Sequence, residues 1–335
     1  MQYLIITLKI FIIEYIILFL HELSHYVVSL ILGFKCSFYY MIPFTIYRKD
    51  SKIKLKLRPS IQSDITSRLH FDSIKISSKL EYNILLKRLK IFLWIGPIFD
   101  FIAFIVLFCI GVTYVNLSYL ALISLIHLSI STINFFNSDG KYAIGSKEDN
   151  RIAFDLIRNA TICGNAEVSC ESKRILTDIH MEISENITLE SFDVNNLWEF
   201  LNNISFYTNS LLSFLNKDLL TIHSSSFAFF EGLINDFDNI KKYDYRQIQK
   251  TSISITYYLI YKKLNDISFY PSSLIMAKIY DGCNSIYFRK LLDLYFKNDS
   301  GNIDYLVNED NMPISISYCQ GYNKLLFNII ELYNL

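Results

Sequence analysis

The stretch Phe11–Gly33 constrains this chain most, because it is apolar over a length that crosses a bilayer and yet contains ionisable side chains in its middle. His21, Glu22 and His25 stand there in the order His-Glu-x-x-His. Positions four apart share one face of a helix, so both imidazoles point the same way and suit one metal ion. Charged groups inside an apolar span are costly and therefore indicate a functional site. The spacing predicts His21 and His25 as metal ligands, with Glu22 as the base that takes a proton from water activated by the metal.

Another acidic residue, Glu14, precedes His21 by seven residues and falls on nearly the same face of the expected helix. It lies about 10 Å away along the helix axis, too far to bind the same ion. Glu14 either lines a watery access path or sits near the outer interface of the membrane. The sequence leaves these alternatives open, and it assigns no role to His127.

Composition favours a membrane protein, because 52% of the 335 residues are hydrophobic and only 19% are charged. The N-terminus lacks the basic region and cleavage site of a signal peptide, so the first span is expected to be retained. We expect three membrane-spanning helices, at about residues 3–33, 91–115 and 117–137. Together they form a three-helix core within residues 1–145 of a mainly α, polytopic integral membrane protein.

Residues 35–90, between the first two spans, have the character of a small β insertion. Apolar and basic residues alternate through residues 52–58, which is the period of a half-buried strand, and residues 38–47 and 71–77 are expected to form neighbouring strands. The insertion carries thirteen basic and four acidic residues, a net charge of +9. An excess of positive charge favours the cytoplasmic side and an anionic membrane surface.

Residues 146–335 contain no apolar run of membrane length and are expected to form a soluble, helical, cytoplasmic domain. Residues 141–335 carry a net charge of −6, which gives no reason to expect a nucleic-acid partner. The sequence at 201–207 recurs in closely similar form at 264–270. Asn-Asn or Asn-Asp steps at 202, 235, 265 and 298 are spaced by 33, 30 and 33 residues. That period suits helical-hairpin repeats, although Asn-rich chains also produce such matches by accident.

A third metal ligand is expected at the end of the third span, where Asp139-Gly140 follows a segment with no charged residue. The first and third spans cross the membrane in the same direction, so Asp139 and the two histidines fall in the same half of the bilayer. A catalytic zinc has three protein ligands and one open position. His21, His25 and Asp139, with Glu22 free to act as a base, meet that requirement.

Residues 1–145 resemble the site-2 protease family of intramembrane zinc metalloproteases. Three motifs carry the resemblance, in the family's order: His21-Glu-Leu-Ser-His25, Gly96-Pro97, and Asn134 followed by Asp139-Gly140. There are departures from the family pattern. Asp100 stands where the family often has Asn after Gly-Pro-x-x, and no Pro follows Asn134.

The resemblance implies that Asp100 and an Asn contact the substrate, and it leaves open whether that Asn is Asn134 or Asn137.

The resemblance implies a Zn²⁺ enzyme that hydrolyses a peptide bond in a membrane-embedded or membrane-adjacent substrate, with Glu22 as general base. The alternative is a non-catalytic membrane anchor, either a degenerate protease or an immunity-type protein, whose cytosolic helical domain binds a protein partner. Stoichiometric zinc favours the enzyme, and absence of metal favours the anchor. The sequence names neither the substrate nor the oligomeric state.

Overall fold

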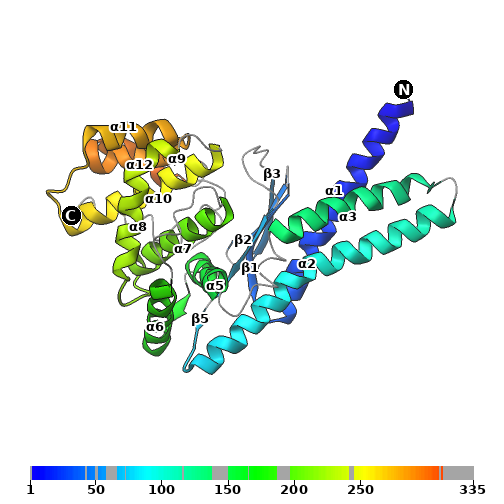
Figure 1. Ribbon diagram of the computed structural model, residues 1–335, viewed down its shortest axis with the longest axis horizontal. Helices are drawn as coiled ribbons and strands as arrows, with labels where there is room; N and C mark the ends of the chain where they lie inside the picture. Colours follow the sequence, from blue (N-terminus) through cyan, green and yellow to red (C-terminus); the bar gives the residue numbers. More distant parts are fainter. Residues whose placement is uncertain are drawn as a thin grey trace. The chain divides into compact units, whose positions relative to one another are not determined.

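The computed structural model is mainly helical, which confirms the predicted fold class at that level (Figure 1). Its contacts divide the chain into two compact units. The first comprises residues 1–69 and 80–153, and the second comprises residues 70–79 and 154–335. The structure describes residues 2–41, 44–49, 52–57, 66–71, 73–114, 117–137, 150–164, 166–186, 197–240, 245–308 and 311.

The first unit contains three apolar helices: α1 (Gln2–Ile31), α2 (Lys79–Thr113) and α3 (Tyr119–Asn137). Two helical segments among the described residues, Thr7–Ile31 and Lys79–Thr113, are long and apolar enough to cross a membrane. The apolar stretch of α3, Tyr119–Thr132, is shorter. Two spans, rather than the expected three, therefore meet the length criterion in the described part of the chain.

The apolar side chains of these helices point outward. Only 11% of the apolar window of α1 and 17% of that of α2 are buried, whereas the core helix of a soluble protein would be mostly buried. Phe11 and Ile31 on α1 are 70% and 75% exposed, and Val112 on α2 is 64% exposed. Such a surface would be a large apolar patch in water, and it matches the acyl chains of a lipid bilayer.

The C-terminal end of α1 is fixed by a glycine. Gly33 has φ +79°, a left-handed conformation that residues with a Cβ rarely adopt. This turn lets the backbone N–H of Phe34 donate to the carbonyl of Ser29 over 2.7 Å, which satisfies a carbonyl at the helix end. Phe34 is thereby buried, with its ring centroid 6.5 Å from that of Phe92 on α2.

Helices α2 and α3 run side by side, and α1 crosses them (Figure 1). The α2–α3 contact is close at Gly111, where a Cβ atom would lie 2.3 Å from the backbone nitrogen of Ala121. Pro97 lies inside α2 rather than at its start. Because proline has no N–H, it leaves the Leu93 carbonyl without its intrahelical donor and loosens that turn of the helix.

The insertion between α1 and α2 forms a four-stranded sheet in the order β3-β2-β1-β4. β1 pairs with β2, and β2 with β3, in antiparallel fashion. The segment 38–47, expected to be one strand, is two strands, and its Pro43 lies outside the described residues. The strands are β1 (Lys35–Met41), β2 (Phe44–Lys49), β3 (Lys52–Leu57) and β4 (Thr66–His70).

The strand expected at 71–77 does not join this sheet. Only β5 (Ser73–Ile74) is extended there, and it pairs in parallel with β6 (Glu167–Val168) of the second unit. Ser172 stabilises this pairing, because its hydroxyl accepts a hydrogen bond from the N–H of Ile76 over 2.7 Å. The segment 70–79 therefore belongs to the second unit and not to the β insertion.

The second unit is built from helices, with α10 contacting α7, α8, α11 and α12. The helices among its described residues are α5 (Asn150–Gly164), α6 (Cys170–Asn186), α7 (Leu197–Leu215), α8 (Ser224–Asn235), α9 (Phe237–Ile240), α10 (Tyr245–Asn265), α11 (Ser273–Gly282), α12 (Ile286–Lys297) and α13 (Ile303–Val307), with a 3-10 turn η3 (Ser300–Asn302).

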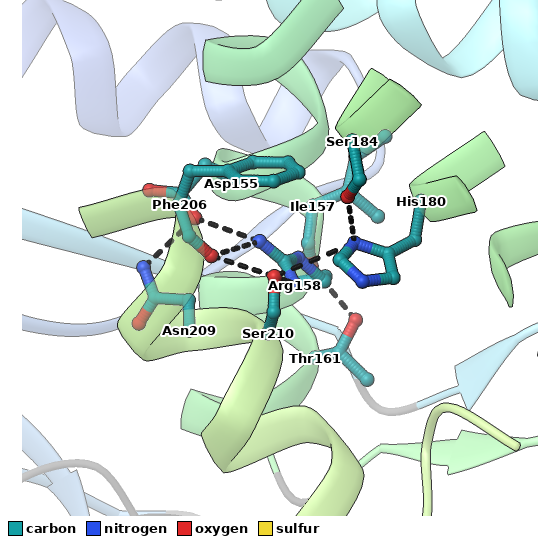
Figure 2. Close-up of polar contacts among 9 residues, drawn as sticks. All are labelled: Asp155, Ile157, Arg158, Thr161, His180, Ser184, Phe206, Asn209 and Ser210. Carbon is teal, nitrogen blue, oxygen red and sulfur yellow. Dashed lines mark hydrogen bonds and ion pairs between the residues drawn. The ribbon is translucent and has the colours of Figure 1, made fainter. Parts of the chain in front are cut away.

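A buried polar cluster ties α5, α6 and α7 together (Figure 2). The guanidinium of Arg158, only 2% exposed, donates to the Ser210 hydroxyl over 2.5 Å, to the Phe206 carbonyl over 2.8 Å and to Asp155 over 3.1 Å. The His180 ring lies beside it, and its Nε2 accepts from the backbone N–H of His223 over 3.3 Å. Burial, together with the charges of Arg158 and His223, lowers the pKa of His180 to about 3.

The two similar stretches at 201–207 and 264–270 have different structures, so they are not repeats of one structural unit. The first lies inside α7, whereas the second spans the end of α10 and the turn after it. Asp266 stops the helix, because its Oδ1 accepts from the backbone N–H of Ser268 over 2.9 Å. Asp266 stands where the first stretch has Asn203, the one position at which the two stretches differ. This residue and the flanking sequence, and not the shared letters, account for the different structures.

Candidate metal site

The predicted motif lies in the C-terminal half of α1, with both histidines directed at α2. His25 is 3% exposed, and His21 and Glu22 are half-buried. The two imidazole rings stand edge to face, with centroids 5.1 Å apart and planes at 62°. The helical period thus places the rings as the sequence predicts, on one face and one turn apart.

Each histidine uses its Nδ1 atom to contact α2. Nδ1 of His21 lies 2.8 Å from Oδ1 of Asp100, and Nδ1 of His25 lies 3.0 Å from the backbone carbonyl oxygen of Phe92. A carbonyl and a carboxylate oxygen only accept hydrogen bonds, so each Nδ1 carries the proton and donates. In a neutral imidazole the other nitrogen, Nε2, then bears the lone pair that binds metal ions.

The two Nε2 atoms converge on Gly96. A Cβ atom at Gly96 would lie 2.4 Å from Nε2 of His25 and 2.5 Å from Nε2 of His21, so the two nitrogens are no more than about 4.9 Å apart. Two nitrogen ligands of one tetrahedral zinc are separated by roughly 3.4 Å. Metal-free ligands relax over such differences when the ion binds. The donor atoms, their tautomers and their convergence therefore fit two of the ligands of a zinc ion.

Gly96 and Pro97 lie one turn beyond the backbone carbonyl that holds His25. That carbonyl belongs to Phe92, and Pro97 removes the intrahelical donor of the neighbouring Leu93 carbonyl. The contribution of Gly96 to the site is space, because a side chain there would collide with both imidazole rings.

A further pair of ionisable groups extends the polar contacts away from the motif. Nε2 of His127 on α3 lies 3.6 Å from Oδ1 of Asp100, within ion-pair range but beyond a direct hydrogen bond. Nδ1 of His127 lies 3.1 Å from Oε2 of Glu14 on α1. The Ser131 hydroxyl also lies 3.3 Å from Nε2 of His127. The His127 ring thus has a carboxylate near each nitrogen, and ionisable side chains link α1, α2 and α3.

The remaining predicted site residues are only partly described. Asp139, the expected third ligand, lies outside the described residues, and the side chains of Asn134 and Asn137 in the last turn of α3 are outside them as well. Within the described ranges, no group of three His, Cys, Asp or Glu side chains is placed to hold a metal ion. The structure brings together His21, His25 and Asp100, and it leaves the third ligand as a prediction.

The sequence left the role of Glu14 open between a watery access path and the outer membrane interface, and it assigned no role to His127. It placed Glu14 on the face of His21 but did not connect it with His127, although an ionisable residue inside each of two apolar spans was a signal for such a pair. The resemblance implied that Asp100 contacts the substrate, and in the structure its carboxylate contacts His21 of α1.

Comparison with known proteins adds no relative of this chain. No protein-family model matches it, and no curated protein or solved structure matches it either.

Proposed function

We propose that this protein is an intramembrane zinc metalloprotease that hydrolyses a peptide bond in a membrane-embedded or membrane-adjacent substrate. The observation that carries the proposal is the convergence of Nε2 of His21 and Nε2 of His25 within 2.5 Å of one point beside Gly96. This convergence occurs on a helix long and apolar enough to cross a bilayer. A side chain at position 96 would collide with both imidazole rings, so the glycine is what allows the two Nε2 atoms to lie together against α2.

The division of labour among the residues follows from their positions. His21 and His25 hold the zinc, with Asp139 as the proposed third ligand. A zinc ion bound there supplies Lewis acidity toward a peptide carbonyl and toward water. Glu22, adjacent to His21 in the chain, takes the proton from the attacking water and later delivers it to the leaving amine nitrogen. Because Asp100 contacts His21, we assign it to orienting that ring rather than to the substrate.

The substrate has to be extended at the point of cleavage, because the amides of a transmembrane helix are all hydrogen-bonded within the helix. In the first unit, the edge strand β3 offers a surface that an extended substrate segment can bind. Among the described strands β3 pairs only with β2, and its Leu55 and Leu57 are 65% and 63% exposed. An unwound segment that pairs with β3 would gain backbone hydrogen bonds and apolar contacts there.

The membrane setting is part of the proposal. Three spans, with residues 35–90 and the second unit in the cytoplasm, would place the histidines and Asp139 in the same half of the bilayer. The +9 net charge of residues 35–90 supports this orientation. In this orientation the second unit lies outside the lipid, where it can bind a protein partner.

Zinc content tests the proposal most directly. The full-length chain, purified in detergent, is expected to contain about one zinc per protein, as a three-ligand site predicts. His21→Ala and His25→Ala are expected to lose the metal, with helicity by circular dichroism as the control for folding. A wild-type protein without zinc, and without zinc-dependent cleavage of membrane peptides, would refute the enzyme and leave the membrane anchor.

A further inference from the structure

Four ionisable residues form a continuous series of contacts through the first unit. Oε2 of Glu14 meets Nδ1 of His127 at 3.1 Å, Nε2 of His127 meets Oδ1 of Asp100 at 3.6 Å, and the same Oδ1 meets Nδ1 of His21 at 2.8 Å. We call these residues the orienting chain. It starts on α1, crosses α3 and α2, and returns to α1 at the motif.

The end of the orienting chain sets the tautomer of His21. A histidine with its proton on Nε2 has no lone pair there for a metal ion, so the ring needs an acceptor at Nδ1. Asp100 supplies that acceptor, and the contact also fixes the rotation of the ring. His25 has a different acceptor, a backbone carbonyl, which side-chain substitutions leave in place.

The first two residues of the orienting chain, Glu14 and His127, keep the Asp100 side chain in its orientation. Oδ1 is the oxygen that faces both histidines, so His127 and His21 bear on the same atom from two helices. An isolated carboxylate in a low-dielectric region is costly and would turn toward water or another donor. With a proton on each ring nitrogen, His127 donates to Glu14 from Nδ1 and presents its Nε2–H to Oδ1 of Asp100, which opposes this rotation. The Ser131 hydroxyl, 3.3 Å from Nε2, contacts the same ring atom. The side chains of His127 and Asp100 are 8% and 12% exposed, so bulk water reaches them little.

We propose that Glu14 and His127 are positioning residues that act through Asp100 to keep His21 in its metal-binding tautomer. This inference rests on the proposed metalloprotease function, although its first test needs neither zinc nor proteolysis. The competing explanation is that the contacts only join the three helices. A helix contact of that kind would affect stability and leave the His21 ring unchanged.

The tautomer can be read directly in the metal-free protein. The full-length chain is labelled with 15N-histidine, reconstituted in lipid vesicles and examined by solid-state NMR, with the His21 signal assigned by its loss in His21→Gln. Wild-type His21 is expected in a single form, protonated at Nδ1. His127→Leu is expected to give a mixture of tautomers at His21, and Glu14→Gln a smaller shift in the same direction. His25 is expected to keep its tautomer in both variants.

Zinc affinity provides the second measurement. Loss of a partner that orients a metal-binding histidine typically costs about 10–100-fold in affinity, so we expect about 10-fold for His127→Leu and less for Glu14→Gln. His127→Gln keeps a donor and an acceptor near the ring positions and should recover part of the loss. Ser129→Ala is the matched control on α3, because its hydroxyl donates to the Leu125 carbonyl of its own helix and its side chain is exposed.

The outcomes separate the two proposals. If His127→Leu lowers thermal stability while His21 keeps one tautomer and zinc affinity stays within twofold, the orienting chain only joins helices and the inference is wrong. If the wild type binds no zinc but His21 still loses its single tautomer in His127→Leu, the proposed function fails and the orienting contact stands. Should His127→Leu fail to fold, Glu14→Gln and His127→Gln carry the same comparison.

Discussion

Gly96 of α2 lies against the imidazole of His25, so closely that a Cβ atom at position 96 would be 2.4 Å from Nε2. Gly96→Ala therefore has to push the ring aside together with that of His21. Loss of a group that orients a metal-binding histidine typically lowers metal affinity about 10–100-fold. Because Gly96→Ala displaces the ligands themselves, we expect zinc affinity to fall by at least as much. Isothermal titration of the metal-free protein measures the change.

Gly111→Ala is the matched control for this substitution. It introduces an equally close contact in the same helix, with the backbone of Ala121 on α3 and not with a histidine. It should lower stability and leave zinc affinity near that of the wild type. Equal loss of zinc in both variants would mean that Gly96→Ala acts through general misfolding.

Glu22→Gln tests whether Glu22 acts as the catalytic base or as a metal ligand. Because the proposed role of Glu22 is proton transfer, the variant should keep zinc and lose about 10²–10⁴-fold in rate. Membrane peptides that accumulate in cells carrying Glu22→Gln, compared with cells carrying the intact protein, report the lost cleavage. Loss of zinc from a folded Glu22→Gln protein would instead place Glu22 among the metal ligands.

Two aspartates are expected to respond differently to replacement by asparagine. Asp139→Asn removes a proposed ligand and should weaken zinc binding strongly and abolish activity. Asp100→Asn keeps an oxygen that accepts from Nδ1 of His21, so the metal should remain, with affinity lowered by about 10-fold at most. Normal zinc affinity in Asp139→Asn would remove the third ligand and most of the enzymatic proposal.

The orientation of the chain in the membrane can be measured with reporter fusions. The +9 net charge of residues 35–90 predicts that a reporter fused at Ser60 is cytoplasmic, and a third span predicts the same for the C-terminus. Matching fusions at Asn116, between the second and third expected spans, should be external. An external signal at Ser60 would invert the topology.

The second unit should lose stability as the pH falls, because of His180. Its pKa is lowered to about 3 in the folded protein, so between about pH 6.5 and 3 the unfolded chain binds a proton that the folded chain does not. Each pH unit in that window costs about 1.4 kcal/mol, which gives about 2 kcal/mol between pH 7.5 and 5. Asp218 works against this, since burial raises its pKa to about 6 and its protonation favours the folded state.

A comparison with His180→Gln isolates the histidine, because Asp218 is present in both proteins. Urea unfolding of the full-length chain can be followed by the fluorescence of Trp198 in α7, in a Trp94→Phe background that leaves one tryptophan. The wild type should lose about 2 kcal/mol more than His180→Gln on going from pH 7.5 to 5. Parallel losses in the two proteins would contradict the low pKa of His180.

The similar stretches at 201–207 and 264–270 show that a short local sequence does not by itself determine secondary structure in this protein. Nearly identical letters form the inside of a helix in one place and a helix end with a turn in the other. Helix propensity is a weak preference that neighbouring residues and tertiary contacts override. Prediction was sound where one strong period governed a long segment, as in the helical motif of α1 and the alternating strand β3.

The sequence by itself determined that His21 and His25 share one face of an apolar helix, because a spacing of four residues and a period of 3.6 are local properties. Only the tertiary structure decided what that face meets: Asp100, 79 residues beyond His21, the Phe92 carbonyl, 67 residues beyond His25, and the bare backbone of Gly96. It also joined Glu14 to His127 across 113 residues. These partners depend on the rotation and register of one helix against another, which packing over the whole interface sets and which no short stretch of sequence encodes.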